Sequence, residues 1–145
     1  MKVTSDIAVL SSALGFGLLI LASISESFVT LFEVLVTLGV PFAAVTLIRR
    51  HLSFKRPYET YDFYEVKPKE KSGKSFPSRH AYSSFVISVM VCFIYPILGT
   101  VLVFLSVLLC LFRVLLGIHF VRDVVCGAVI GTLSAVLGNV IFALF

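Results

Sequence analysis

Residues 81–112 read AYSSFVISVMVCFIYPILGTVLVFLSVLLCLF, and none of these 32 positions holds a charged side chain. One helix of that length would extend about 48 Å, whereas the hydrocarbon core of a bilayer is ~30 Å thick. Pro96 and Gly99 interrupt the run and favour a reversal of the chain there. The stretch therefore predicts two membrane-spanning helices, near 79–95 and 98–115, joined by a short turn.

Apolar runs on either side of this stretch extend the same pattern. Residues 7–25, 28–48 and 119–145 predict three more spans, and Glu33 is the only ionisable residue of the second. The chain is 59% hydrophobic with a mean hydropathy of +1.06, well above a soluble domain. We expect an all-α, polytopic membrane helix bundle with five transmembrane helices. It would be a single domain, residues 1–145, with an interfacial loop carrying short helical segments.

Basic residues gather on one side of the predicted bundle. Five spans place residues 49–76, 78–80 and 113–123 on the same side as the N-terminus, and this side holds all 12 Lys and Arg. The piece KPKEKSGKS at 67–75 is typical of a solvated linker. Because the basic residues do not form a nucleic-acid reading surface, we expect the bilayer and lipid phosphates as partners, and no nucleic acid. The positive-inside rule places this side in the cytoplasm.

Cysteine and small residues inside the apolar runs are interpreted as packing residues. Cys92, Cys110 and Cys126 have no second Cys or His at metal-ligand spacing, so we expect no zinc site, no disulfide and no cofactor. Small residues of the last span favour close helix packing, and they permit a homodimer without requiring one. They are Gly127, Gly131, Ser134, Ala135 and Gly138.

Charged residues next to the apolar runs cluster at helix ends, and charge inside a membrane protein is a functional candidate. Helical spacing places His119 and Asp123 one turn apart, where the carboxylate can orient the imidazole. Such a pair suits nucleophilic catalysis, but a His–Asp pair with a purely structural role at a helix end is at least as common. Other members on the same side are Arg49, Arg56, Arg113 and the predicted helix cap Ser78. Guanidinium groups and a helix N-terminus both bind phosphate, so this side predicts a phosphate site.

Three motifs follow one another along the chain. They are Arg49-x6-Arg56-Pro57, Pro77-Ser78-Arg79-His80 and Phe112-Arg113-x5-His119-x3-Asp123. In order and spacing they resemble K-x6-R-P, P-S-G-H and S-R-x5-H-x3-D, the motifs of the membrane-bound type-2 phosphatidic acid phosphatases. That family is related to the vanadium haloperoxidases and the bacterial class A acid phosphatases. Arg49, Arg79 and Phe112 stand where the family has Lys, Gly and Ser.

The resemblance implies a two-step phosphoryl transfer that needs no metal and no cofactor. His119 would attack phosphorus and form a phosphohistidine, Asp123 would orient its ring, and His80 would protonate the leaving lipid oxygen. Water would then release phosphate. The phosphate would be bound by Arg49, Arg56, Ser78, Arg79 and Arg113.

The expected function is hydrolysis of a lipid phosphate or diphosphate in a bacterial cell membrane. Phosphatidylglycerol phosphate, phosphatidic acid and undecaprenyl diphosphate are the candidate substrates. A lipid phosphotransferase using the same intermediate stays open. So does a non-catalytic anion-binding scaffold, for which the departures at Arg79 and Phe112 are the available evidence. The resemblance implies an extracytoplasmic site and six spans, whereas the charge bias favours a cytoplasmic site and the apolar runs number five.

Overall fold

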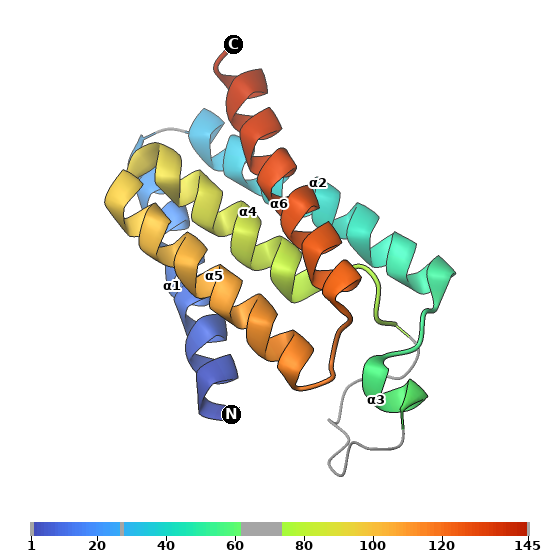
Figure 1. Cartoon of the computed structure of the whole chain (residues 1–145). Helices are drawn as coiled ribbons and strands as arrows, with labels where there is room; N and C mark the ends of the chain where they lie inside the picture. The colour runs from blue at the N-terminus through green and yellow to red at the C-terminus, as the bar shows by residue number, and fades with distance from the viewer. Residues whose placement is uncertain (1, 27, 62–73, 145) are drawn as a thin grey trace.

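The computed structural model describes residues 2–26, 28–61 and 74–144. It consists of five long helices and one short helix (Figure 1): α1 (Lys2–Glu26), α2 (Phe28–Leu52), α3 (Pro57–Thr60), α4 (Arg79–Ile94), α5 (Pro96–Leu115) and α6 (Val121–Phe142). No strand occurs in the described ranges. The all-α prediction is therefore confirmed, and the five long helices correspond to the five predicted spans.

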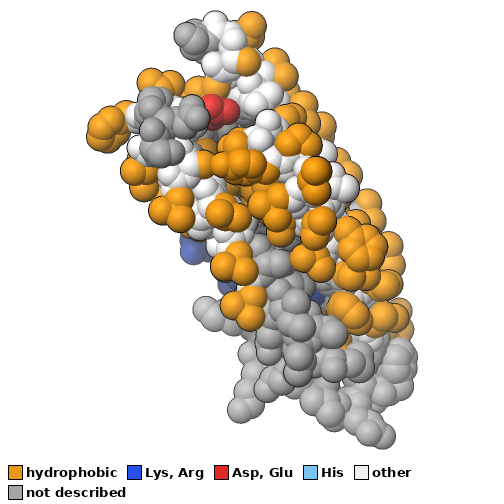
Figure 2. Space-filling view, turned by 90° about the vertical axis from the view of Figure 1, so that its left-hand side faces the viewer, with side chains coloured by type: hydrophobic (Ala, Val, Ile, Leu, Met, Phe, Trp, Pro, Cys, Tyr) orange, Lys and Arg blue, Asp and Glu red, His pale blue; other side chains and the backbone are white. Residues whose placement is uncertain are grey.

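The outer faces of the bundle are apolar. The segment Phe28–Thr60, which contains α2, and the helices α5 and α6 are long and apolar enough to cross a membrane. The described part of α1 has a shorter apolar stretch, and α4 has only 16 residues, or about 24 Å of helix. Large hydrophobic side chains point outward, among them Phe28, Phe104 and Leu133. Figure 2 shows such side chains covering one long face, as expected of a surface in contact with lipid.

Helix α4 is the centre of the bundle. It contacts α1, α2, α5 and α6, and Figure 1 shows it between α5 and α6. Its side chains Tyr82, Val86 and Val91 are almost completely buried and belong to the apolar core. The hydroxyls of Ser88 and Ser106 lie 3.0 Å apart and link α4 to α5. Because α4 is held from several sides, its N-terminus has a fixed place at one end of the bundle.

Glycines of α6 allow its backbone to touch α4. A Cβ atom on Gly127 would lie 2.5 Å from the carbonyl oxygen of Ser78, and one on Gly131 would lie 2.5 Å from that of Tyr82. A Cβ atom on Gly138 would meet the side chain of Thr37 of α2. The predicted close packing of the last helix is confirmed at these glycines. These glycines therefore pack against other helices of the same chain. The homodimer stays a prediction.

Two helix boundaries differ from the prediction in ways that matter for the charged residues. Helix α2 continues to Leu52, so Arg49 and Arg50 lie in its last turn and not in a loop. Cations are favourable there because the C-terminal end of a helix carries partial negative charge. Helix α6 begins at Val121, so His119 lies before the helix and not within it.

Candidate active site

The three motifs meet at one end of the bundle, which is also the end of the N-terminus, while the C-terminus lies at the other (Figure 1). The first motif comes from the end of α2, with Arg49, and from the residue before α3, Arg56. The second motif forms the start of α4, with Ser78, Arg79 and His80. The third motif runs from the last turn of α5, with Arg113, to the start of α6, which His119 and Asp123 flank. Arg56 and Arg113 are close enough to His119 for their charges to affect its titration. Segments far apart in the sequence therefore supply one polar region.

The turn that ends α5 positions His119. Gly117 has a φ of 66°, in the left-handed region that glycine adopts without a steric cost. The backbone N–H groups of Ile118 and His119 donate to the carbonyl of Arg113, at 3.1 and 3.2 Å, and close the helix end. His119 is left between α5 and α6 with 2% of its surface exposed. The expectation that it shares a helical turn with Asp123 was wrong, because the extended backbone of Phe120, the N-cap of α6, lies between them.

His119 and Asp123 nevertheless lie together. The Nδ1 atom of His119 is 3.6 Å from Oδ2 of Asp123, and both side chains are buried. Oδ2 also accepts a hydrogen bond from the backbone N–H of Phe120, at 3.1 Å. A carboxylate beside Nδ1 favours the tautomer with its proton on Nδ1, which leaves the Nε2 lone pair for attack. The pair therefore has the geometry of an oriented nucleophile.

Ser75 is a residue of this region that sequence reasoning missed. Its hydroxyl donates to Oδ2 of Asp123 and lies 3.4 Å from Nδ1 of His119. Its backbone N–H donates to the carbonyl of Phe54 at 2.9 Å, and the residue is fully buried. The interpretation of 67–75 as a solvated linker is wrong at Ser75, and residues 67–73 lie outside the described ranges. The available signal was a hydroxyl residue just before the second motif.

Arg49 holds the loop that carries Ser75. Its guanidinium donates to the backbone carbonyls of Ser75 at 3.2 Å and Pro77 at 2.7 Å, and also to that of Lys74. A planar fork can reach several carbonyls at once, which the compact ammonium of the family's Lys does less well. Arg49 thus connects the end of α2 to the segment that leads into α4. Its predicted contact with phosphate stays a prediction.

Ser78 caps α4. Its hydroxyl accepts a hydrogen bond from the backbone N–H of Ala81 at 3.4 Å, so the predicted cap is confirmed. The backbone N–H of Ser78 donates to the carbonyl of Asp123 at 2.9 Å. A hydroxyl that accepts one bond retains its own proton for donation, so capping and the predicted phosphate contact are compatible.

A basic cavity of about 340 Å³ opens beside these residues. Its lining comprises Thr46, Arg49, Arg50, Arg56, Lys74, Arg79 and His80. Every charged side chain in this lining is a cation, so the cavity attracts anions. Three predicted phosphate-site residues, Arg49, Arg56 and Arg79, line it together with His80, the predicted general acid. The other predicted site residues, Ser78, Arg113, His119 and Asp123, are not in its lining and are each at most 5% exposed. Among the residues that the structure describes, no group of three His, Cys, Asp or Glu side chains could hold a metal ion.

Burial lowers the pKa of His119 below its usual value, because the charged imidazolium would lose its hydration. The positive charges of Arg56 and Arg113 act in the same direction, and Asp123 opposes them. A lowered pKa favours the neutral ring, which is the form that can act as a nucleophile.

Comparison with known proteins places this geometry in context. The model of the PAP2 superfamily matches residues 30–144. Among solved structures the chain is similar to a transmembrane PAP2 type phosphatidylglycerolphosphate phosphatase from Bacillus subtilis, with a TM-score of 0.69 and 22% sequence identity. The likeness covers 97% of this chain and 77% of that chain, and at this identity it shows a shared fold. No curated protein matches the chain.

Proposed function

Because the chain belongs to the PAP2 superfamily, we propose that it is a membrane lipid phosphatase that works through a phosphohistidine on His119. Family membership supports phosphatase activity in general, and the nucleophile and the substrate are the finer parts of the proposal. One observation carries the finer proposal: the buried His119 lies 3.6 Å from Asp123 and within electrostatic reach of Arg56 and Arg113. Oriented imidazole and fixed guanidinium groups are the two components that metal-free phosphoryl transfer needs.

In the proposed reaction, Nε2 of His119 attacks phosphorus, a P–N bond forms, and the P–O bond to the lipid breaks. His80 gives a proton to the departing lipid oxygen. Water then gives a proton to His80 and attacks the phosphohistidine, the P–N bond breaks, and phosphate leaves with His119 and His80 restored. Asp123 holds the ring and stabilises its positive charge throughout. Arg56, Arg113, the Ser78 hydroxyl and the backbone N–H of Arg79 balance the charge on the transferring phosphoryl group.

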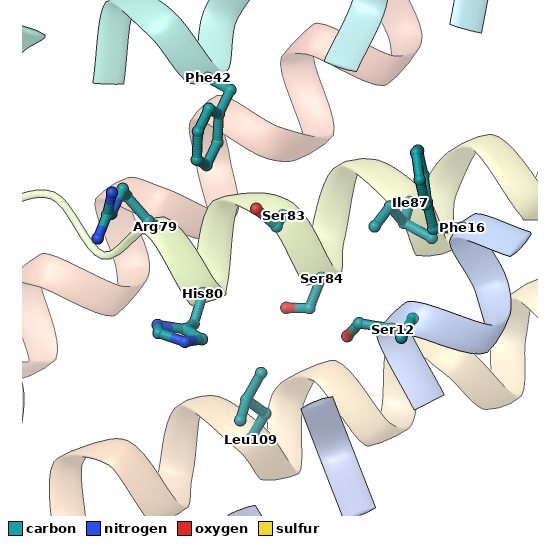
Figure 3. Close-up of a pocket in the computed structure, with 10 residues that line it drawn as sticks. Ser12, Phe16, Phe42, Arg79, His80, Ser83, Ser84, Ile87 and Leu109 are labelled. Carbon is teal, nitrogen blue, oxygen red and sulfur yellow. The ribbon is translucent and has the colours of Figure 1, made fainter. Parts of the chain in front are cut away.

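An apolar groove supports a membrane lipid as the substrate. Its volume is about 480 Å³, and it runs between α1, α2, α4 and α5. Figure 3 shows Arg79 and His80 at one end of the groove, with Phe16 and Ile87 farther along it. The basic cavity includes the same Arg79 and His80 in its lining. An anionic headgroup and an apolar chain would therefore find adjacent sites.

The test is phosphate release by the purified protein in detergent. Phosphatidic acid, phosphatidylglycerol phosphate and undecaprenyl diphosphate are offered with EDTA present, and ³²P-labelled substrate reports acid-labile phosphohistidine. We expect release that persists in EDTA and a loss of at least about 10³-fold in His119→Ala. The matched control is His51→Ala, which removes an exposed imidazole from the end of α2 and should retain activity.

Three results would count against the proposal. Equal release by the wild type and His119→Ala would remove the nucleophile from the mechanism. Transfer of label to a second lipid, with no free phosphate, would make the protein a phosphotransferase. Binding of the lipids without any turnover would make it an anion-binding scaffold.

The charge distribution supports a site that faces the cytoplasm. All 12 Lys and Arg lie on the site side of the predicted topology, and positive residues accumulate on the cytoplasmic side of membranes. A reporter fused to the C-terminus, at the opposite end of the bundle, tests this. Activity of a reporter that works only outside the cytoplasm supports the proposal, and activity of one that works only in the cytoplasm refutes it.

A further inference from the structure

Arg79 takes the place of a glycine in the second motif, and its side chain borders two hollows of different character. We propose that Arg79 binds a second phosphate group of the substrate, between the scissile phosphate and the lipid tail. It thereby selects lipids with two phosphates, such as lipid diphosphates or a phosphatidylglycerol phosphate, over lipid phosphate monoesters. This inference rests on the proposed function and assigns its substrate class.

The position of Arg79 carries the first step. The basic cavity and the apolar groove share two lining residues, Arg79 and His80, and Figure 3 shows both at the same end of the groove. A two-phosphate lipid has a fixed order: scissile phosphate, leaving oxygen, second phosphate, tail. In phosphatidylglycerol phosphate a glycerol lies between the leaving oxygen and the second phosphate. With His80 at the leaving oxygen and the tail in the groove, the second phosphate falls at the junction where Arg79 lies.

Charge balance carries the second step. Five cations line the basic cavity, and one of them, Arg49, donates to backbone carbonyls of the loop before α4. Arg56 is 2% exposed, whereas Arg50 and Arg79 are exposed at the rim and Lys74 is half-buried. A phosphate monoester carries a charge of at most about −2 near neutral pH, and a second phosphate adds to it. The excess of cations therefore favours a more highly charged headgroup.

Arg79 differs from its neighbours at the rim in two ways. Arg50 and Lys74 line only the basic cavity, whereas Arg79 lines both the basic cavity and the apolar groove. It is the first residue of α4 and precedes the proposed general acid His80 in the sequence, so the helix start fixes the backbone from which it reaches. A guanidinium can bind two oxygens of one phosphate, which gives this position selectivity beyond simple charge attraction.

The experiment compares kcat/KM for phosphatidylglycerol phosphate and undecaprenyl diphosphate with kcat/KM for phosphatidic acid. Arg79→Gln and Arg79→Gly should lower this selectivity ratio by about 10- to 100-fold, the size expected for one charge-assisted phosphate contact. Arg79→Lys should restore part of the ratio. Lys55→Gln removes the same charge from an exposed position outside both hollows and should keep the wild-type ratio. A ratio that stays the same in the Arg79 variants overturns the inference.

A binding measurement separates this inference from the proposed function. Methylenediphosphonate and methylphosphonate, which resist hydrolysis, are compared for their effect on thermal unfolding in detergent. We expect the diphosphonate to stabilise the wild type more, and Arg79→Gln to remove that difference. Equal stabilisation by the two ligands, or a difference that persists in Arg79→Gln, overturns the inference. If no lipid is hydrolysed, the proposed function fails and this measurement alone decides the role of Arg79.

Discussion

Two neighbouring parts of the N-terminal half of α4 are held by different kinds of contact. At the start of the helix, side-chain and backbone hydrogen bonds join Ser75 and Ser78, in the segment that leads into α4, to Asp123 of α6. Farther along, the backbone of α6 touches α4 at Gly131, with apolar side chains around the crossing. The first set fixes the orientation of reactive groups, and the second fixes the distance between helices. Changes at the first should therefore affect turnover most, and changes at the second should affect stability most.

The largest effect is expected at Asp123. Asp123→Asn keeps the shape of the side chain but removes the charge that favours the Nδ1–H tautomer of His119, so kcat should fall by about 10³- to 10⁴-fold. Phosphate release from the best substrate measures this. Glu33→Gln makes the same change in α2, away from the site, and should change kcat little. Comparable losses in the two variants would contradict a special role for the contacts at the start of α4.

A smaller loss is expected at Ser75. Ser75→Ala removes the hydroxyl that donates to Asp123, leaving the carboxylate less firmly held, and kcat should fall by about 10- to 100-fold. The acid limb of the pH profile should also move, since the surroundings of His119 change. Ser134→Ala removes a hydroxyl that bonds within α6, to Ile130, and serves as the control. A wild-type profile in Ser75→Ala would show that Ser75 only fills space.

Gly131 and Gly39 test the packing contacts. Gly131→Ala places a Cβ atom against the Tyr82 carbonyl and should reduce the free energy of unfolding by about 1–3 kcal/mol. Gly39→Ala, in α2, meets no atom within 4 Å and should stabilise its helix by about 0.5–1 kcal/mol. Thermal unfolding followed by circular dichroism measures both. The explanation of α6 packing fails if both variants shift in the same direction by the same amount.

The smallest effect concerns pH. The pKa of His119 is lowered by burial and by Arg56 and Arg113, so the neutral ring persists below the usual titration range of histidine. The acid limb of kcat/KM should therefore lie below pH 6.5 and should be absent from the residual activity of His119→Ala. A pH series with phosphatidic acid measures it. An acid limb above pH 6.5 would show that another group controls this titration.

Much of the fold and of the site followed from the sequence because membranes and motifs leave simple patterns. The charge-free run around Pro96 and Gly99 predicted two helices and their turn, and α4 and α5 confirm it. The place of His119 did not follow, because the i,i+4 spacing of His119 and Asp123 is the same whether a helix or a turn separates them. The extended conformation of Phe120, which lies between them as the N-cap of α6, starts the helix after His119.

Contacts between loops were also beyond the sequence. Ser75 reaches Asp123 while Arg49 binds the carbonyls around it, and no local sequence pattern encodes the meeting of these three segments. The roles assigned to His119, His80, Asp123 and the phosphate-site residues stay predictions until variants are assayed. Their common location at one end of the bundle is what the structure adds.

The length of α4 has a consequence for the depth of the site. Its 16 residues extend about 24 Å, some 6 Å less than a typical hydrocarbon core. Because α1, α2, α5 and α6 surround α4, the bilayer does not have to adapt to this length. Helices α4 and α5 leave the same turn at Tyr95, and α5 has 20 residues, so the start of α4 lies about 6 Å short of the end of α5. A phosphate bound at Arg79 and His80 would therefore lie deeper than the headgroups around the bundle.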